Sequence, residues 1–254
     1  MTAAMSIQAR DIDHLTVTSE TPGPMAEKLT RLGFTLTPEA TDPRCICFQP
    51  AEDDIPNYIE IADGGASFAN LAMNVAELKG EERTFSFESD DGYQVDAALI
   101  VGDGGGPLPW LPVKQVNPDA FMEPEWIVHP NGALAMLCVH AVADDPKDTA
   151  KKLKAAWKAE TEEIFDGCTL VRTGAVELLI WSPAAYQNEY KSVEAMAPAR
   201  KPAIVGIAIA VERSRPLQAL LRANNVAFAL TEGDRVLVAP EQSGGLMIEF
   251  MPQT

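Results

Sequence analysis

The sequence contains few basic residues and only three histidines. Among its 254 residues, 20 lysines and arginines stand against 37 aspartates and glutamates, so the formal net charge is −17. Nucleic acids and anionic membrane surfaces are bound through lysine and arginine, and we therefore expect neither as a partner. The acidic balance is compatible with a neutral or cationic small molecule.

Long apolar runs are missing as well. No run approaches the roughly 18 residues that a membrane-spanning helix requires, and residues 1–11 show no apolar segment after a basic start. We therefore expect no transmembrane segment, no secretory signal and a cytoplasmic location. Four cysteines without a Cys-x-x-Cys pair argue against a zinc ribbon and a disulfide framework, and indicate free thiols.

Motifs of several large enzyme classes are also absent. The chain has no Gly-x-Ser-x-Gly nucleophile elbow, and nicotinamide and ATP motifs are missing. The glycine-rich segment 102–106 follows an expected strand, but Pro107, Pro109 and Pro112 forbid the helix that a phosphate-binding loop needs. We expect a hairpin or loop tip here, and no nucleotide cofactor.

What the sequence does contain is a recurring order of elements. Met25, Leu29 and Leu32 recur at helical spacing and Gly33 follows them, which predicts a helix over 24–32. Alternating apolar residues between turn residues predict strands around this helix. The first unit therefore has the order β-α-β-β-β, with strands expected at 12–18, 34–36, 45–48 and 58–62.

The same order recurs twice in the second half. Helices expected over 146–157 and 216–223 each begin at a proline, where the missing N–H costs nothing, and follow apolar strands at 134–142 and 204–211. Further strands are expected at 169–172, 176–181, 226–229, 235–239 and 246–251. A degenerate second unit lies between the first and third, with a short, polar helix segment at 77–84 and strands expected at 69–75, 95–101 and 110–116.

These repeats predict an α+β fold. Four β-α-β-β-β units are expected to pair into two cupped, mostly antiparallel sheet modules with the helices outside. The first module pair is expected to cover 10–125 and the second 126–254.

Five short motifs follow one another along the chain. They are Asp13-His14-Leu15, Leu32-Gly33-Phe34, Tyr58-Ile59-Glu60, Trp126 followed by 129–133, and the closing run 245–250. In this order and spacing they resemble the vicinal oxygen chelate superfamily, and most closely its glyoxalase-like branch (the glyoxalase, bleomycin-resistance and dioxygenase type). The resemblance implies paired units that form a cup for a metal or a small ligand. It also implies a homodimer, since relatives often dimerise.

Two departures from the family pattern concern the metal. Many relatives carry a glycine and an asparagine where this chain has Asp42-Pro43-Arg44, and several have a Gln-His pair where it has Gln115-Val116. Metal-dependent relatives usually present three or four ligands from His, Glu or Gln across two units. Only two positions of this chain match cleanly.

Alternation places those two positions on one face. His14 and Thr16 share one face of the first strand, and Tyr58 and Glu60 share one face of a later strand, away from the aliphatic side chains. Imidazole and carboxylate together suit one divalent ion, Zn, Fe, Mn or Ni, and the resemblance puts His14 and Glu60 at ligand positions. The alternative is a hydrogen-bonded His–Glu pair that lines a metal-free pocket.

Further candidates are expected around this pair. Gln115 is the expected third ligand, with Asn70 and Asn74 as weaker ones. Substrate contacts are expected from Thr16, Tyr58, Trp110 and Trp126, although scattered aromatic residues also occur in cores. His129, which precedes the turn signature 130–132, is expected either to contact substrate or to cap the junction between the halves.

The second half offers a weaker set. Cys138 and His140 share one face of a strand, and Glu249 lies in the last strand. Pro22 and Pro146 lie 124 residues apart, and by the same shift Cys138, not His140, corresponds to His14. We interpret this set as structural, with His140 satisfied by a local hydrogen bond.

The sequence therefore predicts a small-molecule enzyme of the glyoxalase type. The metal would act as a Lewis acid on a substrate with adjacent oxygens and stabilise an enolate or oxyanion, in an isomerase, lyase or dioxygenase reaction. Glu60 could instead serve as the general base. The alternative is a non-catalytic protein that binds a small molecule, or sequesters an antibiotic, in a metal-free cup, as some members of the superfamily do.

Overall fold

The first half of the chain forms one seven-stranded sheet. A computed structural model describes residues 6–38, 43–52, 55–64, 68–88, 94–195 and 197–253. The elements of the first half are β1 (Ala9–Ser19), α1 (Pro22–Arg31), β2 (Arg44–Glu52), β3 (Ile55–Asp63), β4 (Phe68–Val75), β5 (Glu81–Glu88), β6 (Gln94–Val101) and β7 (Trp110–Gln115).

The second half forms an eight-stranded sheet. The short helices η1 (Pro118–Phe121) and α2 (Pro124–Ile127) lead into it. Its elements are β8 (Ala133–Val142), α3 (Pro146–Trp157), β9 (Glu160–Phe165), β10 (Cys168–Arg172), β11 (Glu177–Trp181), α4 (Pro183–Glu189), η2 (Lys191–Val193), β12 (Ala203–Val211), α5 (Ser214–Ala223), β13 (Ala229–Leu230), η3 (Glu232–Asp234), β14 (Val236–Val238), α6 (Pro240–Ser243) and β15 (Met247–Pro252).

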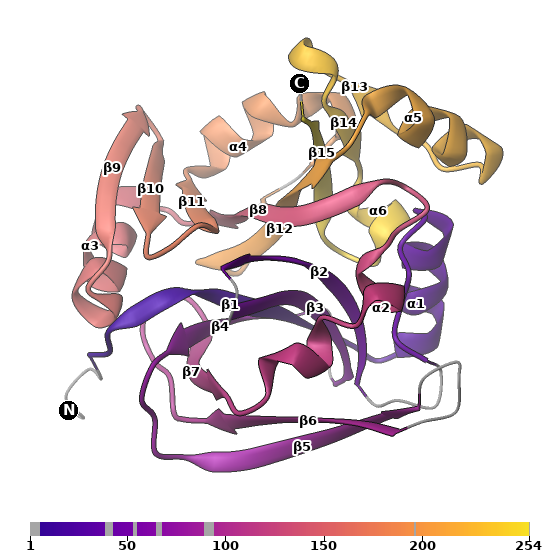
Figure 1. The fold of residues 1–254 in the computed structure, drawn as a ribbon. Helices are drawn as coiled ribbons and strands as arrows, with labels where there is room; N and C mark the ends of the chain where they lie inside the picture. Colours follow the sequence, from indigo (N-terminus) through magenta and orange to yellow (C-terminus); the bar gives the residue numbers. More distant parts are fainter. Residues whose placement is uncertain are drawn as a thin grey trace.

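The two sheets repeat one pattern of pairing. Their strand orders are β2-β3-β1-β4-β7-β6-β5 and β13-β14-β15-β12-β8-β11-β10-β9. The first strands of two units pair antiparallel at the centre of each sheet, β1 with β4 and β8 with β12. Each first strand also pairs in parallel with the last strand of its own unit, as β1 does with β3. The expected α+β fold of paired, mostly antiparallel units is confirmed (Figure 1).

Two expected elements are absent. Residues 34–36 form no strand, because Gly33 at φ +84° ends α1 and the following backbone bonds back to the helix and across to His129. Residues 77–80 form no helix, and β5 begins directly afterwards. A Cβ at Gly80 would lie 2.1 Å from the carbonyl oxygen of Val101, so the close approach of these two segments requires glycine.

The two sheets pack back to back. Leu15 and Val17 of β1 share one buried cluster with Ile207 and Ile209 of β12. The apolar faces of α1, α3 and α5 join the same cluster, so the helices lie outside the two cups, as expected. None of the described helices combines the length and the apolar character needed to cross a membrane.

The concave face of each sheet is covered by a linker. Phe121 and Trp126, from η1 and α2, pack against Tyr58 in the first cup. Tyr186 and Tyr190, from the segment of α4 and η2, pack against strand residues of the second cup in the same way. Each unit pair therefore fills its own cup with aromatic side chains.

The expected boundary after residue 125 falls inside α2, between the last strand of one sheet and the first strand of the other. That the two modules fold independently stays a prediction.

The four cysteines are free and buried. Burial raises the pKa of the Cys47 thiol to about 12, so it stays a neutral thiol near pH 7. Asp42, one of the expected departures from the family pattern, lies outside the described residues.

Candidate functional site

His14 and Glu60 meet on the concave face of the first sheet. In the parallel register of β1 and β3, His14 lies opposite Tyr58, and Thr16 lies opposite Glu60. His14 Nε2 is 3.5 Å from Glu60 Oε2. His14 is almost fully buried, and the Glu60 side chain retains 13% of its exposure. The two residues that alternation placed together are therefore neighbours, with Glu60 as the accessible member.

A third residue orients His14. Asp13 Oδ1 lies 2.8 Å from His14 Nδ1, and Asp13 is fully buried. The Asp13 carboxylate also accepts hydrogen bonds from Asn74 Nδ2 and Gln115 Nε2, so it acts as an acceptor toward His14 as well. Nδ1 of the imidazole therefore carries a proton, and in the neutral form of the ring the lone pair on Nε2 points toward Glu60.

Strand alternation alone does not predict the Asp13–His14 contact. Adjacent residues of a regular strand point to opposite faces. The pairing of β1 with β4 shifts register between Ile12 and His14, and this irregularity brings both side chains together. The only signal in the sequence was the adjacency of the two residues.

Gln115 lies beside Asp13. Its amide nitrogen donates to Asp13 Oδ1 at 2.7 Å, on the Nδ1 side of the ring, and no contact joins it to His14 Nε2 or Glu60. Asn74 likewise contacts Asp13, at 2.8 Å. In this structure Gln115 supports the carboxylate that orients His14, and its expected role as third metal ligand stays a prediction.

Thr16 and Tyr58 complete the surroundings of the pair. Thr16 Oγ1 donates to Glu60 Oε2 at 3.2 Å. The ring of Tyr58 stacks on His14 with centroids 4.3 Å apart, and Phe121 stacks on the other face of Tyr58 at 4.4 Å. Burial, and then the charges of Asp13 and Glu60, raise the pKa of Tyr58 well above its usual range, so this phenol stays neutral.

The remaining expected substrate contacts lie elsewhere. Trp126 is buried in the cup, where it belongs to the cluster around Tyr58. Trp110 belongs to the core between the sheets and packs edge-on against Trp157. Both indole rings are packed in buried clusters, and a substrate contact from either stays a prediction.

His129 has a structural role. Its Nε2 donates to the carbonyl oxygen of Cys47 at 2.8 Å, and its Nδ1 accepts from the amide of Thr35 at 3.1 Å. Both nitrogens are thus occupied by backbone, which leaves none for a substrate. Burial lowers the pKa of His129 to about 4. Of the two expectations for this residue, the junction between the halves is the one that the contacts support.

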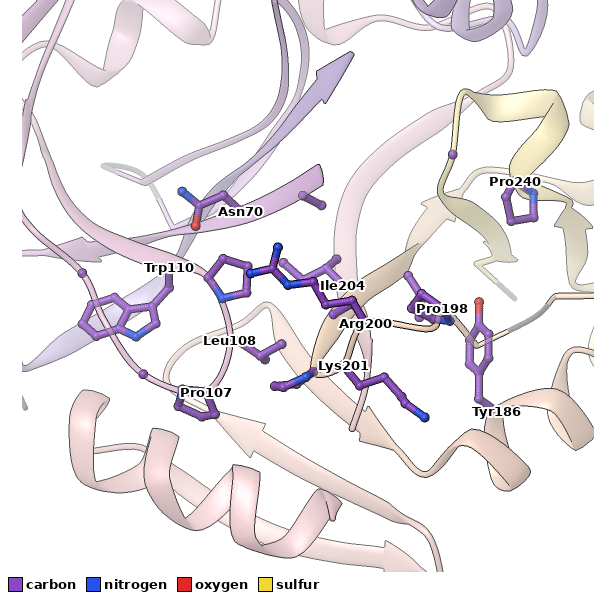
Figure 2. Close-up of a pocket in the computed structure, with 18 of the residues that line it drawn as sticks. Asn70, Pro107, Leu108, Trp110, Tyr186, Pro198, Arg200, Lys201, Ile204 and Pro240 are labelled. Atoms are coloured by element: carbon purple, nitrogen blue, oxygen red, sulfur yellow. The ribbon is translucent and has the colours of Figure 1, made fainter. Parts of the chain in front are cut away.

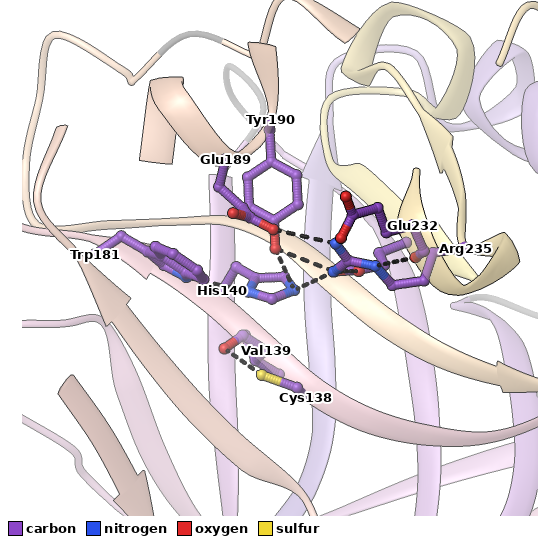
Figure 3. A network of polar contacts seen from close by, with 9 residues as sticks. Cys138, Val139, His140, Trp181, Glu189, Tyr190, Glu232 and Arg235 are labelled. Atoms are coloured by element: carbon purple, nitrogen blue, oxygen red, sulfur yellow. Dashed lines mark hydrogen bonds and ion pairs between the residues drawn. The ribbon is translucent and has the colours of Figure 1, made fainter. Parts of the chain in front are cut away.

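A second histidine and carboxylate, His140 and Glu249, meet in the other cup. Figure 3 shows His140 of this network with Trp181, Tyr190 and Arg235. His140 Nε2 lies 3.5 Å from Glu249 Oε2, the same spacing as in the first cup. Here a hydroxyl joins the two groups, because the Tyr190 oxygen lies 3.0 Å from Glu249 Oε2 and 3.5 Å from His140 Nε2. The other carboxylate oxygen, Glu249 Oε1, forms an ion pair with Arg235 Nη1 at 2.6 Å.

The second histidine has the opposite tautomer. Trp181 Nε1 lies 3.2 Å from His140 Nδ1, and an indole N–H can only donate. Nδ1 of His140 therefore accepts, and the proton of the neutral ring resides on Nε2. Burial raises the pKa of Glu249, but hydrogen bonds from His140 and Tyr190 and the Arg235 charge more than offset it and lower that pKa. The side chains of this network are bonded to one another, and His140 is hydrogen-bonded as the sequence predicts.

Only the first pair can accept a metal ion without rearrangement. Two ligands of one tetrahedral divalent ion, each ~2.0–2.2 Å from it, lie roughly 3.4 Å apart. The 3.5 Å between His14 and Glu60 fits that spacing, and the Asp13–His14 contact is the usual support of a ligating imidazole. Within the described ranges no three His, Cys, Asp or Glu side chains converge. His14 and Glu60 thus fit as two protein ligands of a metal ion, and water or substrate would occupy its remaining coordination positions.

Solved structures share this architecture over nearly the whole chain. A variant of 4-hydroxymandelate synthase from Streptomyces coelicolor has a TM-score of 0.55 at 13% identity, and the match covers 98% of this chain and 95% of that one. A variant of homoprotocatechuate 2,3-dioxygenase from Brevibacterium fuscum has a TM-score of 0.58 at 11% identity, over 99% and 73%. This chain has the vicinal oxygen chelate fold.

Other comparisons set the limits of this likeness. A xylose isomerase-like TIM barrel/4-hydroxyphenylpyruvate dioxygenase fusion protein has a TM-score of 0.55 at 10% identity, and the chain spans only 49% of its length. No protein-family model matches the sequence, and no curated protein does either. At these identities the likeness shows the fold alone, and the chemistry has to be argued from the residues.

Proposed function

We propose that this protein is a small-molecule enzyme whose reacting centre is the His14–Glu60 pair with one divalent metal ion. The observation that carries the proposal is the position of His14, whose Nδ1 lies 2.8 Å from Asp13 Oδ1 while its Nε2 lies 3.5 Å from Glu60 Oε2. The 3.5 Å gap exceeds an ordinary N–H···O hydrogen bond of ~2.7–3.2 Å and suits a shared cation. No described side chain bridges the gap.

The residues of this chain would divide the work as follows. Asp13 fixes the ring of His14 and keeps its proton on Nδ1. Glu60, half-buried and held by Thr16, has one oxygen turned to His14 and can take or return a substrate proton. A metal ion bound there supplies Lewis acidity to substrate oxygens.

The favoured substrates carry two adjacent oxygens, as a catechol or a dicarbonyl does. The names of the structural neighbours include an aromatic synthase and a ring-directed dioxygenase, which supports a phenolic substrate class. A substrate chelated in this way can enter an isomerase, lyase or dioxygenase reaction. We propose the chelation step and do not choose among the three reactions.

The test compares two matched histidine variants. Protein purified without chelators and reconstituted with Zn²⁺, Mn²⁺, Fe²⁺ or Ni²⁺ should hold roughly one equivalent of metal by elemental analysis. His14→Ala should lose it, and His140→Ala should retain it provided its circular dichroism spectrum is native. Less than roughly a tenth of an equivalent in the wild type, or equal loss in both variants, would overturn the metalloenzyme proposal.

One observation favours a second candidate, a metal-free binding protein. Two protein ligands are fewer than metal-dependent relatives present, and Phe121 and Trp126 form an apolar lining in the first cup. Thermal-shift measurements on metal-free protein with dicarbonyls, catechols and cationic drugs separate the two functions. A shift that needs no metal and survives His14→Ala supports the binding protein, and a shift that appears only with metal supports the enzyme.

A further inference from the structure

A large cavity lies between the two halves of the chain (Figure 2). Its volume is about 770 Å³, which is within the range of small-molecule sites. The first half contributes Asn70 of β4 and the glycine-rich loop that leads into β7, and the second half contributes the segment 198–205 before and within β12. The glycine-rich segment that lacks a phosphate-binding helix therefore forms one wall of this cavity.

Two cationic side chains line the cavity in a chain that is strongly acidic overall. Arg200 and Lys201 are consecutive, and both lie along the cavity (Figure 2). Lys201 is held by Asp144 at 2.7 Å. Arg200 is exposed, and no hydrogen bond or ion pair joins it to another described residue. A guanidinium without a partner is available to a carboxylate or sulfonate.

The rest of the lining is mostly apolar and rigid. Leu108 and Ile204 are buried, and several prolines limit the movement of the walls. One polar atom of the lining residues, Trp110 Nε1, is buried without a hydrogen-bond partner. Such a group is usually satisfied in a native protein, and a ligand could satisfy it here.

Acidic residues also line the cavity, and they restrict where the anionic group of a ligand can bind. Glu194 and Glu241 also line the cavity, and both are exposed. They repel a second anionic group, so the cavity suits a ligand with one anionic end at Arg200 and Lys201. The remaining body should be apolar or aromatic and contact Leu108 and Ile204.

We propose that this cavity binds a small organic acid, with an apolar or aromatic body and one anionic group held by Arg200 and Lys201. The site is separate from the His14–Glu60 pair. Asn70 is paired with Thr16 across β1 and β4, and therefore lies two strands away from Glu60, on the order of 10 Å. The proposal does not depend on the reaction at that pair.

The probes are anilinonaphthalene sulfonate and its uncharged parent, N-phenylnaphthylamine, which differ only in the sulfonate. Fluorescence titration of the full chain should give saturable binding of the sulfonate. Arg200→Gln combined with Lys201→Gln should raise the Kd of the sulfonate at least about fivefold and leave that of the neutral dye within about twofold. Arg200 is exposed and Lys201 is partly exposed, and a native circular dichroism spectrum of the double variant is the control for folding.

Two further variants make the result decisive. Glu194→Gln combined with Glu241→Gln should lower the Kd of the sulfonate by up to about twofold, which is the opposite sign at the same cavity. Ala203→Trp should fill the cavity and weaken both dyes by about tenfold or more. Wild-type affinity for the sulfonate in the Arg200/Lys201 variant, unchanged binding of both dyes in Ala203→Trp, or no saturable binding to the wild type would each overturn the proposal.

Discussion

The two halves of the molecule each bring a histidine and a glutamate to 3.5 Å, yet the two pairs differ chemically. In the first half, Asp13 accepts from Nδ1 of His14 and leaves Nε2 as a lone pair. In the second half, Trp181 donates to Nδ1 of His140, so Nε2 carries the proton. At the same spacing, the third partner therefore determines which ring nitrogen carries the proton.

The two glutamates differ in the same way. Glu249 is buried and receives Tyr190 and Arg235, so its charge is balanced within the protein. Among the described residues, Glu60 accepts a side-chain hydrogen bond from Thr16 alone, and its side chain stays 13% exposed. The second-half carboxylate is therefore expected to stabilise the fold, and the first-half carboxylate to serve a ligand.

The largest expected effect is on stability. Glu249→Ala leaves Arg235 and Tyr190 without their buried partner and should lower the free energy of unfolding by about 3 kcal/mol. Glu60→Ala removes a less buried group and should cost no more than about 1 kcal/mol. Urea denaturation followed by circular dichroism measures both. Equal losses in the two variants would remove the distinction between the pairs.

The next effect concerns His129 and the pH dependence of the free energy of unfolding. Burial lowers the pKa of His129 to about 4, below an unfolded value of ~6.5. A lowered histidine pKa contributes stability that is present above pH 6.5 and is lost as the pH falls toward 4, on the order of 3 kcal/mol in total.

Urea denaturation across that range, on the wild type and on His129→Gln, checks this prediction. The wild type should lose stability more steeply between pH 6.5 and 4, and the variant should show a flatter profile whatever its starting stability. Parallel profiles would show that His129 is not held neutral by the Cys47 and Thr35 backbone.

A smaller effect is expected from the indole that sets the second tautomer. Trp181→Phe removes the donor to His140 Nδ1 and should cost about 1–2 kcal/mol, mostly through packing. The His140 ring should then populate both tautomers, which nitrogen chemical shifts report. A ring that stays fully protonated on Nε2 would show that Tyr190 and Glu249 alone suffice to fix it.

The smallest effect tests the role of Gln115. As a residue that positions Asp13, Gln115→Leu should weaken metal binding by about tenfold and keep the stoichiometry. Isothermal titration with Zn²⁺ measures both quantities, and Gln218→Leu on α5, whose side chain bonds to Ser214 and Arg222, is the matched control. Complete loss of binding in Gln115→Leu would instead assign Gln115 as a metal ligand.

Much of the architecture was predictable because it depends on periodicity. The helix over 146–157 and the shared face of His14 and Glu60 follow from spacing alone, and both are confirmed. The missed strands β5 and β9 are edge strands rich in charged residues, and each contains only two large apolar residues. The repeat nevertheless predicted four units in two paired modules.

The chemistry of the site was less predictable, because it depends on irregularities. Asp13 reaches His14 only through a register shift, and Gln115 reaches Asp13 across 102 residues of sequence. The linkers that carry Phe121 and Tyr190 into the two cups have no repeating pattern. Such contacts arise from tertiary packing, which spacing along the chain does not report.

The most direct test of the central claim is the tautomeric state of the three histidines. A long-range proton–nitrogen correlation spectrum distinguishes an imidazole protonated on Nδ1 from one protonated on Nε2, and with three rings the assignment is short. We predict that at pH 8 His14 is protonated on Nδ1, that His129 and His140 are protonated on Nε2, and that added Zn²⁺ shifts only Nε2 of His14. A His14 ring protonated on Nε2, or a Zn²⁺ response at His140, would contradict the account.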